Sequence, residues 1–509
     1  MLDRVVREAA RRFGDATAFE AAAGWPLSYR QLDRLSDEAA AGLARRGLRE
    51  GDVLGLALPS TLDYVVAYAA CAKLGAVTAG VNSQLAPAER GGALARVEPK
   101  LVLASDNLAV PGAEVVPIAE DAEGVLGPLR ARDLGAAPPA LAEDPTRAVA
   151  IVFSSGTSGA PKPALFAGHQ LAEIARIDIG SAWATGGRTM ASTSFAHVGF
   201  MTKLPWYLMT GGTVYLLGRW RPATALHLIE RAGITSLGGV PPQLALLLAQ
   251  PDFDQVDMSS VATIVLGGGP ATPELRREGV TRFGAAMSIR YSSTESGGVG
   301  TGTAFDASPV EAWDTVGRGR GGIGITIRDE DDHVLGPEEL GRICLRTAAA
   351  MSGYWRDDVA TATVRTADGA LRMGDLGWLD GHGYLHITGR ADDAYVRGGY
   401  NVHPQEVEGV LAAHPAVADI AIVGRPDPVL GEIGVAVVVA RAGAPQPDLA
   451  ALRSFAADRL ATYKLPDRVE FVEALPLTAM DKLDRRALKL GNGTPGSPGA
   501  RDRGITGNR

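Results

Sequence analysis

Strand-like and helix-like segments alternate along most of this chain, and the alternation restricts the folds that it can adopt. Residues 29–46 carry apolar side chains at helical spacing, and residues 52–59 form a short apolar strand. A second apolar helix follows and ends near Gly75. Further strands are expected at residues 213–217, 236–239 and 263–266. Strands that alternate with helices form parallel sheets covered on both faces, so an α/β fold is expected.

The length of 509 residues predicts more than one domain. We expect residues 1–390 to form a large N-terminal domain of two doubly wound sheets plus a small β subdomain, because glycines multiply and strands shorten after residue 311. A hinge then leads to a small α+β C-terminal domain over residues 391–490. The Gly- and Pro-rich residues 491–509 are expected to be a disordered tail.

Composition indicates a cytoplasmic enzyme. The net charge of −8 gives no general reason to expect a nucleic-acid or membrane partner. The apolar residues 65–80 contain Lys73 and fall short of a membrane span, and the N-terminus lacks the apolar core of a signal peptide. Cys71 and Cys344 are too few for a disulfide framework or a metal cluster, so both are expected in the core.

A loop rich in glycine and hydroxyl side chains follows the buried strand expected at residues 148–152. It contains Ser154, Ser155, Thr157, Ser158 and Lys162. Glycines let the backbone approach a ligand closely, and hydroxyls and a lysine suit a polyphosphate. The spacing differs from that of an ordinary P-loop, because Pro163 stands where a hydroxyl should follow the lysine. The loop resembles instead the phosphate loop of the adenylate-forming superfamily, which includes acyl- and aryl-CoA synthetases and peptide-synthetase adenylation domains.

A second motif of that superfamily is similar to residues 291–295, Tyr-Ser-Ser-Thr-Glu. A ring can pack on a purine, a hydroxyl can bond a phosphate, and a carboxylate can hold Mg²⁺. The resemblance implies that Tyr291 lies against adenine, that Thr294 meets the α-phosphate and that Glu295 holds the metal.

Residues 371–393 resemble the longest signature of the superfamily. The resemblance implies that Asp375 holds the ribose hydroxyls, that Arg390 assists it and that Asp392 is the hinge of the C-terminal domain. Gly398 and Gly399 resemble the glycine pair that lines the CoA tunnel during thioester formation. Lys482 resembles the adenylation lysine, which offsets charge in the transition state.

The acyl pocket is expected near His197 and near Gly267, Gly268 and Gly269, which precede the adenine motif. Glycines at 297, 298, 300 and 302 suggest room for a bulky apolar acid. The run Gly317–Gly322 fits the dinucleotide fingerprint, but a strand-like segment follows it, so we reject that reading.

These motifs imply an acyl-CoA ligase. It would use ATP and Mg²⁺ to convert a carboxylic acid to acyl-AMP, and would then form the acyl-CoA thioester with coenzyme A. A free-standing adenylation enzyme that loads a carrier protein is the second hypothesis, and a non-catalytic binding protein is the third. The third is disfavoured because the charged residues of all the motifs are present.

Two departures keep a variant of the first hypothesis open. Pro163 cannot donate a backbone hydrogen bond in the phosphate loop, and Asp481 places a negative charge beside Lys482. Both departures bear on adenylation, whereas the glycine pair for thioester formation is intact. The chain could therefore be weak in adenylation and take preformed acyl-AMP from an upstream adenylating enzyme.

Overall fold

A computed structural model describes residues 1–105, 108–118, 124–131, 141–154, 161–397, 400–478 and 483–489. The chain divides into two compact units, Met1–Ile387 and Thr388–Arg509, and the division falls within strand β20 (Leu385–Arg390). Within the described ranges, every helix is too short or too polar to cross a membrane. The large unit of mostly parallel sheets and the small C-terminal unit confirm the expected fold class.

The first sheet of the N-terminal unit has seven strands in the order β18-β8-β7-β4-β3-β5-β6. They are β3 (Val53–Ala57), β4 (Val77–Gly80), β5 (Leu101–Ser105), β6 (Val115–Ile118), β7 (Ala148–Phe153), β8 (Pro163–Ala167) and β18 (Gly353–Tyr354). Strands β3 to β7 are parallel, whereas β8 and β18 pair in the antiparallel sense. Strands β3 and β5 are buried along their whole length, as expected for strands between two helical layers.

The second sheet has nine strands in the order β15-β14-β13-β12-β11-β9-β10-β1-β2. They are β1 (Thr17–Glu20), β2 (Pro26–Ser28), β9 (Arg188–Ala191), β10 (Thr213–Leu216), β11 (Ser236–Gly239), β12 (Thr263–Gly267), β13 (Ala286–Tyr291), β14 (Thr301–Gly302) and β15 (Arg318–Gly319). The six strands from β13 to β1 in this order are parallel, and the edges are antiparallel. The three strands expected between residues 213 and 266 are confirmed as β10, β11 and β12.

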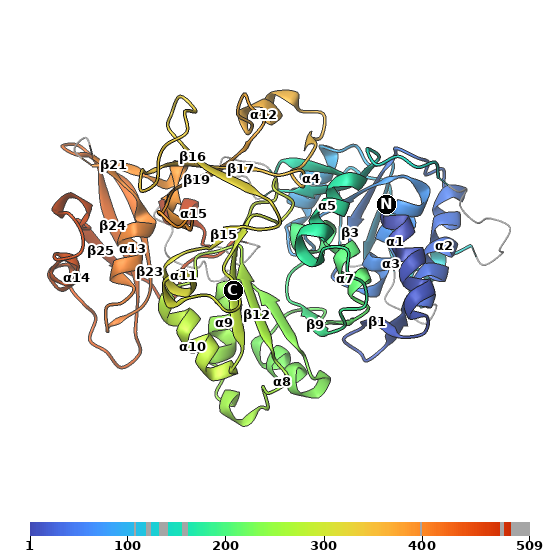
Figure 1. Cartoon of the computed structure of the whole chain (residues 1–509), viewed down its shortest axis with the longest axis horizontal. Helices are drawn as coiled ribbons and strands as arrows, with labels where there is room; N and C mark the ends of the chain where they lie inside the picture. The colour runs from blue at the N-terminus through green and yellow to red at the C-terminus, as the bar shows by residue number, and fades with distance from the viewer. Residues whose placement is uncertain are drawn as a thin grey trace, which may run out of the picture. The chain divides into compact units, whose positions relative to one another are not determined.

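Helices cover these sheets, and α1, α2 and α3 pack against one another near the N-terminus (Figure 1). The helices are α1 (Leu2–Phe13), α2 (Tyr29–Arg45), α3 (Leu62–Leu74), α4 (Pro87–Ala95), α5 (Gly168–Ile179), α6 (Val198–Met201), α7 (Leu204–Thr210), α8 (Pro222–Ala232), α9 (Pro241–Leu248), α10 (Pro273–Phe283), α11 (Pro309–Asp314) and α12 (Asp358–Thr363). Ser28 and Gln31 form a capping box that starts α2. Gly75, at φ 71°, ends α3 in the left-handed conformation that glycine tolerates.

A smaller sheet has the order β16-β17-β19-β20 and includes β16 (Gly324–Arg328), β17 (Gly341–Arg346) and β19 (Leu371–Leu379). It is the β subdomain expected from the short, glycine-rich segments. Strand β16 follows Gly317–Gly322 directly, which confirms that this run is no dinucleotide fingerprint. Both cysteines are buried free thiols, Cys344 in β17 and Cys71 in α3, and burial raises the pKa of Cys71 to about 12. Both are core residues, as expected.

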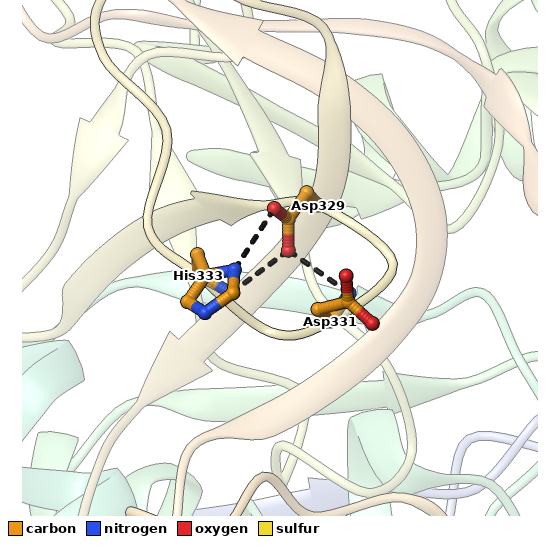
Figure 2. A group of neighbouring side chains, drawn as sticks. All are labelled: Asp329, Asp331 and His333. Atoms are coloured by element: carbon orange, nitrogen blue, oxygen red, sulfur yellow. Dashed lines mark hydrogen bonds and ion pairs between the residues drawn. The ribbon is translucent and has the colours of Figure 1, made fainter.

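The hairpin between β16 and β17 brings Asp329, Asp331 and His333 together (Figure 2). Asp329 Oδ1 accepts hydrogen bonds from the backbone N–H groups of Asp331 at 2.9 Å and His333 at 2.8 Å. The His333 Nδ1 atom lies 3.2 Å from Asp329 Oδ2. These contacts order the turn. They are sufficient to hold the three side chains close together, so a bound ion is not needed to explain why they are neighbours.

The C-terminal unit is an α+β structure. Its strands are β21 (Tyr395–Arg397), β22 (Tyr400–Val402), β23 (Val417–Asp427), β24 (Gly431–Ala440) and β25 (Arg468–Phe471), and its helices are α13 (Pro404–Leu411), α14 (Leu449–Ala456) and α15 (Arg485–Lys489). The sheet order is β22-β21-β24-β23, and β25 pairs with β24. Arg485 forms ion pairs with Glu408 at 2.7 Å and Asp393 at 3.2 Å, so α15 is fixed onto α13.

Candidate active site

The carboxyl ends of parallel strands from the two large sheets converge in the N-terminal unit. The Phe195 N–H, after β9, donates a hydrogen bond to Ser60 Oγ, after β3, at 3.0 Å. The Asn82 Nδ2 atom, after β4, lies 3.3 Å from His197 Nε2. Ligand sites of α/β sheets lie at the carboxyl ends of their strands, so this convergence is the expected place for a site.

His197 stands on a rigid apolar base at the start of α6. The rings of Phe195 and Phe200 stack with their centroids 3.6 Å apart, and the Tyr64 ring meets Phe195 edge-on at 5.7 Å. All three rings are buried, whereas His197 is half-buried. The structure thus joins the predicted His197 to Asn82, a residue that the sequence analysis missed because it lies in no recognised motif.

The three glycines expected near the acyl pocket follow β12. Gly267 is its last residue and pairs with Arg290 of β13, and Gly268 turns the chain at φ 79°. A side chain at Gly268 would have its Cβ 3.5 Å from Val240, which follows β11, so the chain segments after these two strands approach closely. Gln243 strengthens this edge because its Nε2 donates to the Ser192 carbonyl at 2.6 Å while its Oε1 accepts from the Val240 N–H at 3.1 Å.

Tyr291 and Asp375 are brought together from β13 and β19. The Tyr291 hydroxyl donates a hydrogen bond to Asp375 Oδ2 at 2.7 Å. Asp375 lies where the pairing of β19 with β17 shifts register, next to Gly374 at φ 77°. Such irregularities redirect side chains near active sites. The residues predicted to meet adenine and ribose are therefore neighbours, with Asp375 oriented by the Tyr291 hydroxyl.

Glu295 is held by a tyrosine that no sequence motif indicated. The Tyr354 hydroxyl donates to Glu295 Oε1 at 2.9 Å, and Glu295 accepts at its carbonyl from the Met351 N–H at 2.8 Å. Burial raises the pKa of Tyr354, and the Glu295 charge adds to the effect, so the hydroxyl remains a donor. The Lys162 ammonium lies over the same ring, 5.3 Å from its centroid. Tyr354 thus places the predicted phosphate lysine and the predicted metal ligand around one side chain.

The turn of residues 293–298 presents Thr294 next to Glu295. The Gly297 N–H donates to the Thr294 carbonyl and the Gly298 N–H to the Ser293 carbonyl, both at 3.0 Å. Gly297 and Gly298 have φ angles of 75° and 72°, which the turn requires and which glycine tolerates.

The expectation that the glycines at 297, 298, 300 and 302 leave room for an acid is wrong for Gly297 and Gly300. A Cβ at Gly300 would lie 2.2 Å from the Tyr291 carbonyl oxygen, and one at Gly302 would lie 1.8 Å from an Arg290 nitrogen. A Cβ at Gly297 would lie 2.6 Å from Ile174. Gly297 and Gly300 therefore allow close packing and leave no space beside them for an acid, whereas at Gly302 the nearby atom is the end of the Arg290 side chain. An added Cβ at Gly298 would lie farther from its nearest neighbour, 3.3 Å from Val198.

The two ends of the phosphate loop are joined by the backbone. The buried Ser154 donates its N–H to the Lys162 carbonyl at 2.9 Å, extending the antiparallel pair of β7 and β8. Ser155, Thr157 and Ser158 lie outside the described residues. Pro163 is the first residue of β8, and its carbonyl accepts from the Trp355 N–H at 2.7 Å. The first position of a strand is one that proline tolerates.

The remaining predicted residues belong to the C-terminal unit. Arg390 ends β20, and Asp392 lies in the short helical turn Ala391–Asp393. Gly398, Gly399 and Lys482 lie outside the described residues. The hairpin arms that flank the two glycines are fixed, because Arg397 binds Asp467 with contacts of 2.8 and 2.6 Å and the Tyr400 ring stacks on Tyr463 at 4.6 Å.

Comparison with known families identifies the family to which this chain belongs. Residues 6–355 match the model of AMP-binding enzymes, and residues 406–482 match the model of the AMP-binding enzyme C-terminal domain. The chain belongs to the AMP-binding enzyme family. Membership agrees with the expected superfamily and implies that this enzyme uses ATP or AMP.

Relatives of this AMP-binding enzyme are ligases. The chain is 32% identical to an indoleacetate–CoA ligase of Aromatoleum aromaticum, over 90% of this chain and 91% of that protein. It is 30% identical to a fatty acid–[acyl-carrier-protein] ligase of Streptomyces coeruleorubidus, over 92% of each. Its structure is similar to that of ATP-bound MatB from Rhodopseudomonas palustris, with a TM-score of 0.87, 26% identity and coverage of 97% of this chain and 99% of that one.

Proposed function

We propose that this AMP-binding enzyme is an acyl-CoA ligase for a bulky, apolar carboxylic acid. In the first half-reaction a carboxylate oxygen of the acid attacks the α-phosphorus of ATP, giving acyl-AMP and pyrophosphate. In the second half-reaction the thiol of CoA attacks the acyl carbon, giving acyl-CoA and AMP. The observation that carries the proposal is the grouping of Lys162, Glu295 and Tyr354, together with the Tyr291–Asp375 pair, in the N-terminal unit.

The N-terminal unit supplies the groups for nucleotide binding. The Tyr291 ring packs on adenine, while Asp375 accepts hydrogen bonds from the ribose hydroxyls and is kept in place by the Tyr291 hydroxyl. Lys162 and the loop hydroxyls bind the β- and γ-phosphates, and Thr294 binds the α-phosphate. A carboxylate that keeps one oxygen for a cation suits Mg²⁺, so Glu295 would hold that ion, which neutralises phosphate charge when bound.

The acid binds between the segments that follow β9 and β12. His197, held by Asn82, faces the carboxylate end, and Gly267, Gly268 and Gly269 let the acid lie close to the backbone. A bulky apolar acid is supported by the similarity to a ligase named for indoleacetate.

The C-terminal unit supplies residues for each half-reaction. Lys482 contacts the substrate carboxylate and the α-phosphate during adenylation, and Gly398 and Gly399 line the passage for the CoA thiol during thioester formation. Rotation of the C-terminal unit about Asp392 exchanges the arrangement for adenylation with the arrangement for thioester formation. Arg390 assists in nucleotide binding.

The position of Pro163 is compatible with the complete two-step reaction, because the proline breaks no hydrogen bond of the sheet. Residues of an antiparallel strand direct N and C=O to the same side. The Pro163 carbonyl faces Trp355, so the missing N–H removes no hydrogen bond between β7 and β8. The fold therefore accommodates proline at the end of the phosphate loop.

The test is a complete reaction with separate product analysis. The purified enzyme is incubated with ATP, Mg²⁺ and a panel of aromatic, alicyclic and fatty acids, with either CoA or a phosphopantetheinylated carrier protein as acceptor. The proposal expects AMP, pyrophosphate and acyl-CoA in equal amounts for at least one bulky acid. Acylation of the carrier with no acyl-CoA would show that the enzyme is a carrier-loading ligase instead.

A further inference from the structure

An open cleft of about 350 Å³ lies in the N-terminal unit at the edge of the nine-stranded sheet. Its floor is built by β13, β14 and β15, and by the chain segment that follows β14. The residues that give it chemical character are Arg290, Phe305, Glu311, Arg318, Arg320 and Tyr384. Three of these are arginines, and only one is a carboxylate.

The single carboxylate of the cleft is already engaged. Glu311 is buried, and its Oε1 accepts a hydrogen bond from the Ala304 N–H at 2.7 Å. Glu311 also interacts with the Tyr384 hydroxyl, and its one negative charge faces the three positive charges of the guanidinium groups in the cleft.

Behind the cleft, one aspartate is shared by two cations. Asp178 binds Arg320 at 3.0 Å and Lys203 at 2.6 Å. Asp178 also attracts Arg290, but it forms no ion pair with it. Arg290, Arg320 and Lys203 therefore carry three positive charges against one negative charge.

Arg290 is the least compensated of these cations. Burial, together with repulsion from Arg320, lowers its pKa to about 10, so it remains charged at neutral pH. Among the described residues it has no carboxylate within ion-pair distance, and its guanidinium lies 5.8 Å from the centroid of the Phe305 ring. An arginine without an acidic partner in a concave site is suited to bind a carboxylate or phosphate.

Aromatic surface accompanies this charge. The Phe305 side chain is 44% exposed, although it lines the cleft, and the Arg318 guanidinium lies 4.0 Å from the centroid of the Tyr384 ring. Stacking fixes the plane of a guanidinium while its edge remains free to donate hydrogen bonds. The cleft thus combines oriented donors with an exposed apolar ring.

We propose that this cleft binds a small organic anion, with Arg290 and Arg318 contacting its carboxylate or phosphate oxygens and Phe305 contacting its planar, apolar part. The site is distinct from the predicted adenine and ribose contacts, because Arg290 and Tyr291 are successive strand residues whose side chains point to opposite faces of the sheet. The proposal concerns binding, so it does not depend on the ligase activity.

The test uses phenyl phosphate as the probe, with inorganic phosphate for comparison, and measures dissociation constants by calorimetry. Both titrations use the full-length Lys162→Ala variant, which weakens competing binding at the phosphate loop. We expect Arg290→Gln in this background to weaken phenyl phosphate binding by about tenfold or more, the effect of losing one charge-assisted hydrogen bond. Phe305→Ala should remove most of the preference for phenyl phosphate over inorganic phosphate.

Arg277→Gln is the matched control, because Arg277 also lies over an aromatic ring, Trp313 at 5.4 Å, and lies outside the cleft lining. Arg318→Gln, which changes an exposed residue, gives a second reading if Arg290→Gln does not fold. The proposal is overturned if folded Arg318→Gln and Phe305→Ala proteins bind phenyl phosphate as tightly as their Lys162→Ala parent.

Two further comparisons identify the source of the anion. If it is a second carboxylate of the acid, Arg290→Gln lowers kcat/KM for a dicarboxylic acid more than for its monocarboxylic analogue. If it is a phosphate of the acceptor, the variant reduces the preference for CoA over dephospho-CoA. If neither preference changes while phenyl phosphate binding is lost, the cleft serves a separate free anion and the binding site stands.

Discussion

Tyr354 donates a 2.9 Å hydrogen bond to Glu295, although 59 positions of sequence separate the two residues. The same ring lies beneath the ammonium of Lys162. One buried side chain therefore fixes the carboxylate proposed to hold Mg²⁺ and contacts the lysine proposed to bind phosphate. This arrangement connects the strand β18, which carries Tyr354, to the nucleotide chemistry.

Replacing Tyr354 by phenylalanine should slow adenylation by about tenfold to a hundredfold. The variant keeps the ring under Lys162 but removes the donor to a charged carboxylate, an interaction worth about 1.5–3 kcal/mol. Acid-dependent pyrophosphate release, measured over a range of Mg²⁺ concentrations, gives the effect. Tyr29→Phe is the control, because it removes a buried hydroxyl that donates to the Gly212 carbonyl at 2.8 Å, away from the site. Equal losses in both variants would contradict the role of Tyr354.

The Tyr291–Asp375 contact predicts non-additive effects on ATP binding. Asp375→Ala removes the ribose contact and should weaken ATP binding by about a hundredfold, whereas Tyr291→Phe should cost about three- to tenfold because Asp375 loses its orientation. In the double variant, the second change should add almost nothing, since its partner is gone. Fluorescence titration with ATP supplies the four dissociation constants. Full additivity would show that the hydroxyl acts independently of Asp375.

Sequence patterns predicted the α/β architecture because buried parallel strands are continuous apolar runs, as in β3 and β5. They also indicated Tyr291, Glu295 and Asp375, whose residue types sit in recognisable local motifs. Asn82 and Tyr354 escaped notice, since each gains its role only from a tertiary contact. Local composition misled at Gly297, where glycine allows close packing against Ile174 and the Ala349 carbonyl, two neighbours that are distant in sequence.

The buried Asp178 predicts a loss of stability at low pH. Burial raises the pKa of this carboxyl, but Lys203 and Arg320 outweigh that effect, so its pKa lies below the ordinary value of 3.8. Its contribution is therefore present above pH 3.8 and is lost as the pH falls through the lower folded-state pKa. Asp178→Asn should lower the free energy of unfolding by about 3–5 kcal/mol at pH 7, because it leaves buried cations unpaired.

Urea unfolding at pH 7 and at successively lower pH values tests this prediction. The difference in unfolding free energy between the wild type and Asp178→Asn should shrink as the pH falls below 3.8. Asp257→Asn is a suitable control, since the pKa of Asp257 is lowered by local hydrogen bonds to Ser259 on the surface. A difference that is constant with pH would mean that the Asp178 charge is not the stabilising feature.

Pro163→Gly should change the rate of pyrophosphate release by no more than about threefold, a shift of roughly 0.6 kcal/mol in the barrier. The reason is that Pro163 begins β8, where its carbonyl already has a partner in Trp355 and no ladder hydrogen bond with β7 is missing. Stopped-flow detection of pyrophosphate with wild type and variant gives the comparison. A gain of one or two orders of magnitude would support the alternative of an enzyme that is weak in adenylation.

The most direct test of the proposed function is acid-dependent exchange of labelled pyrophosphate into ATP, measured without CoA. The wild type should catalyse exchange only when a suitable carboxylic acid and Mg²⁺ are present. Glu295→Gln should lower the exchange at least about a hundredfold, and the exposed Glu274→Gln should leave it unchanged. The contradicting result is an enzyme that shows no exchange with any acid yet converts synthetic acyl-AMP and CoA to thioester, because adenylation would then occur elsewhere.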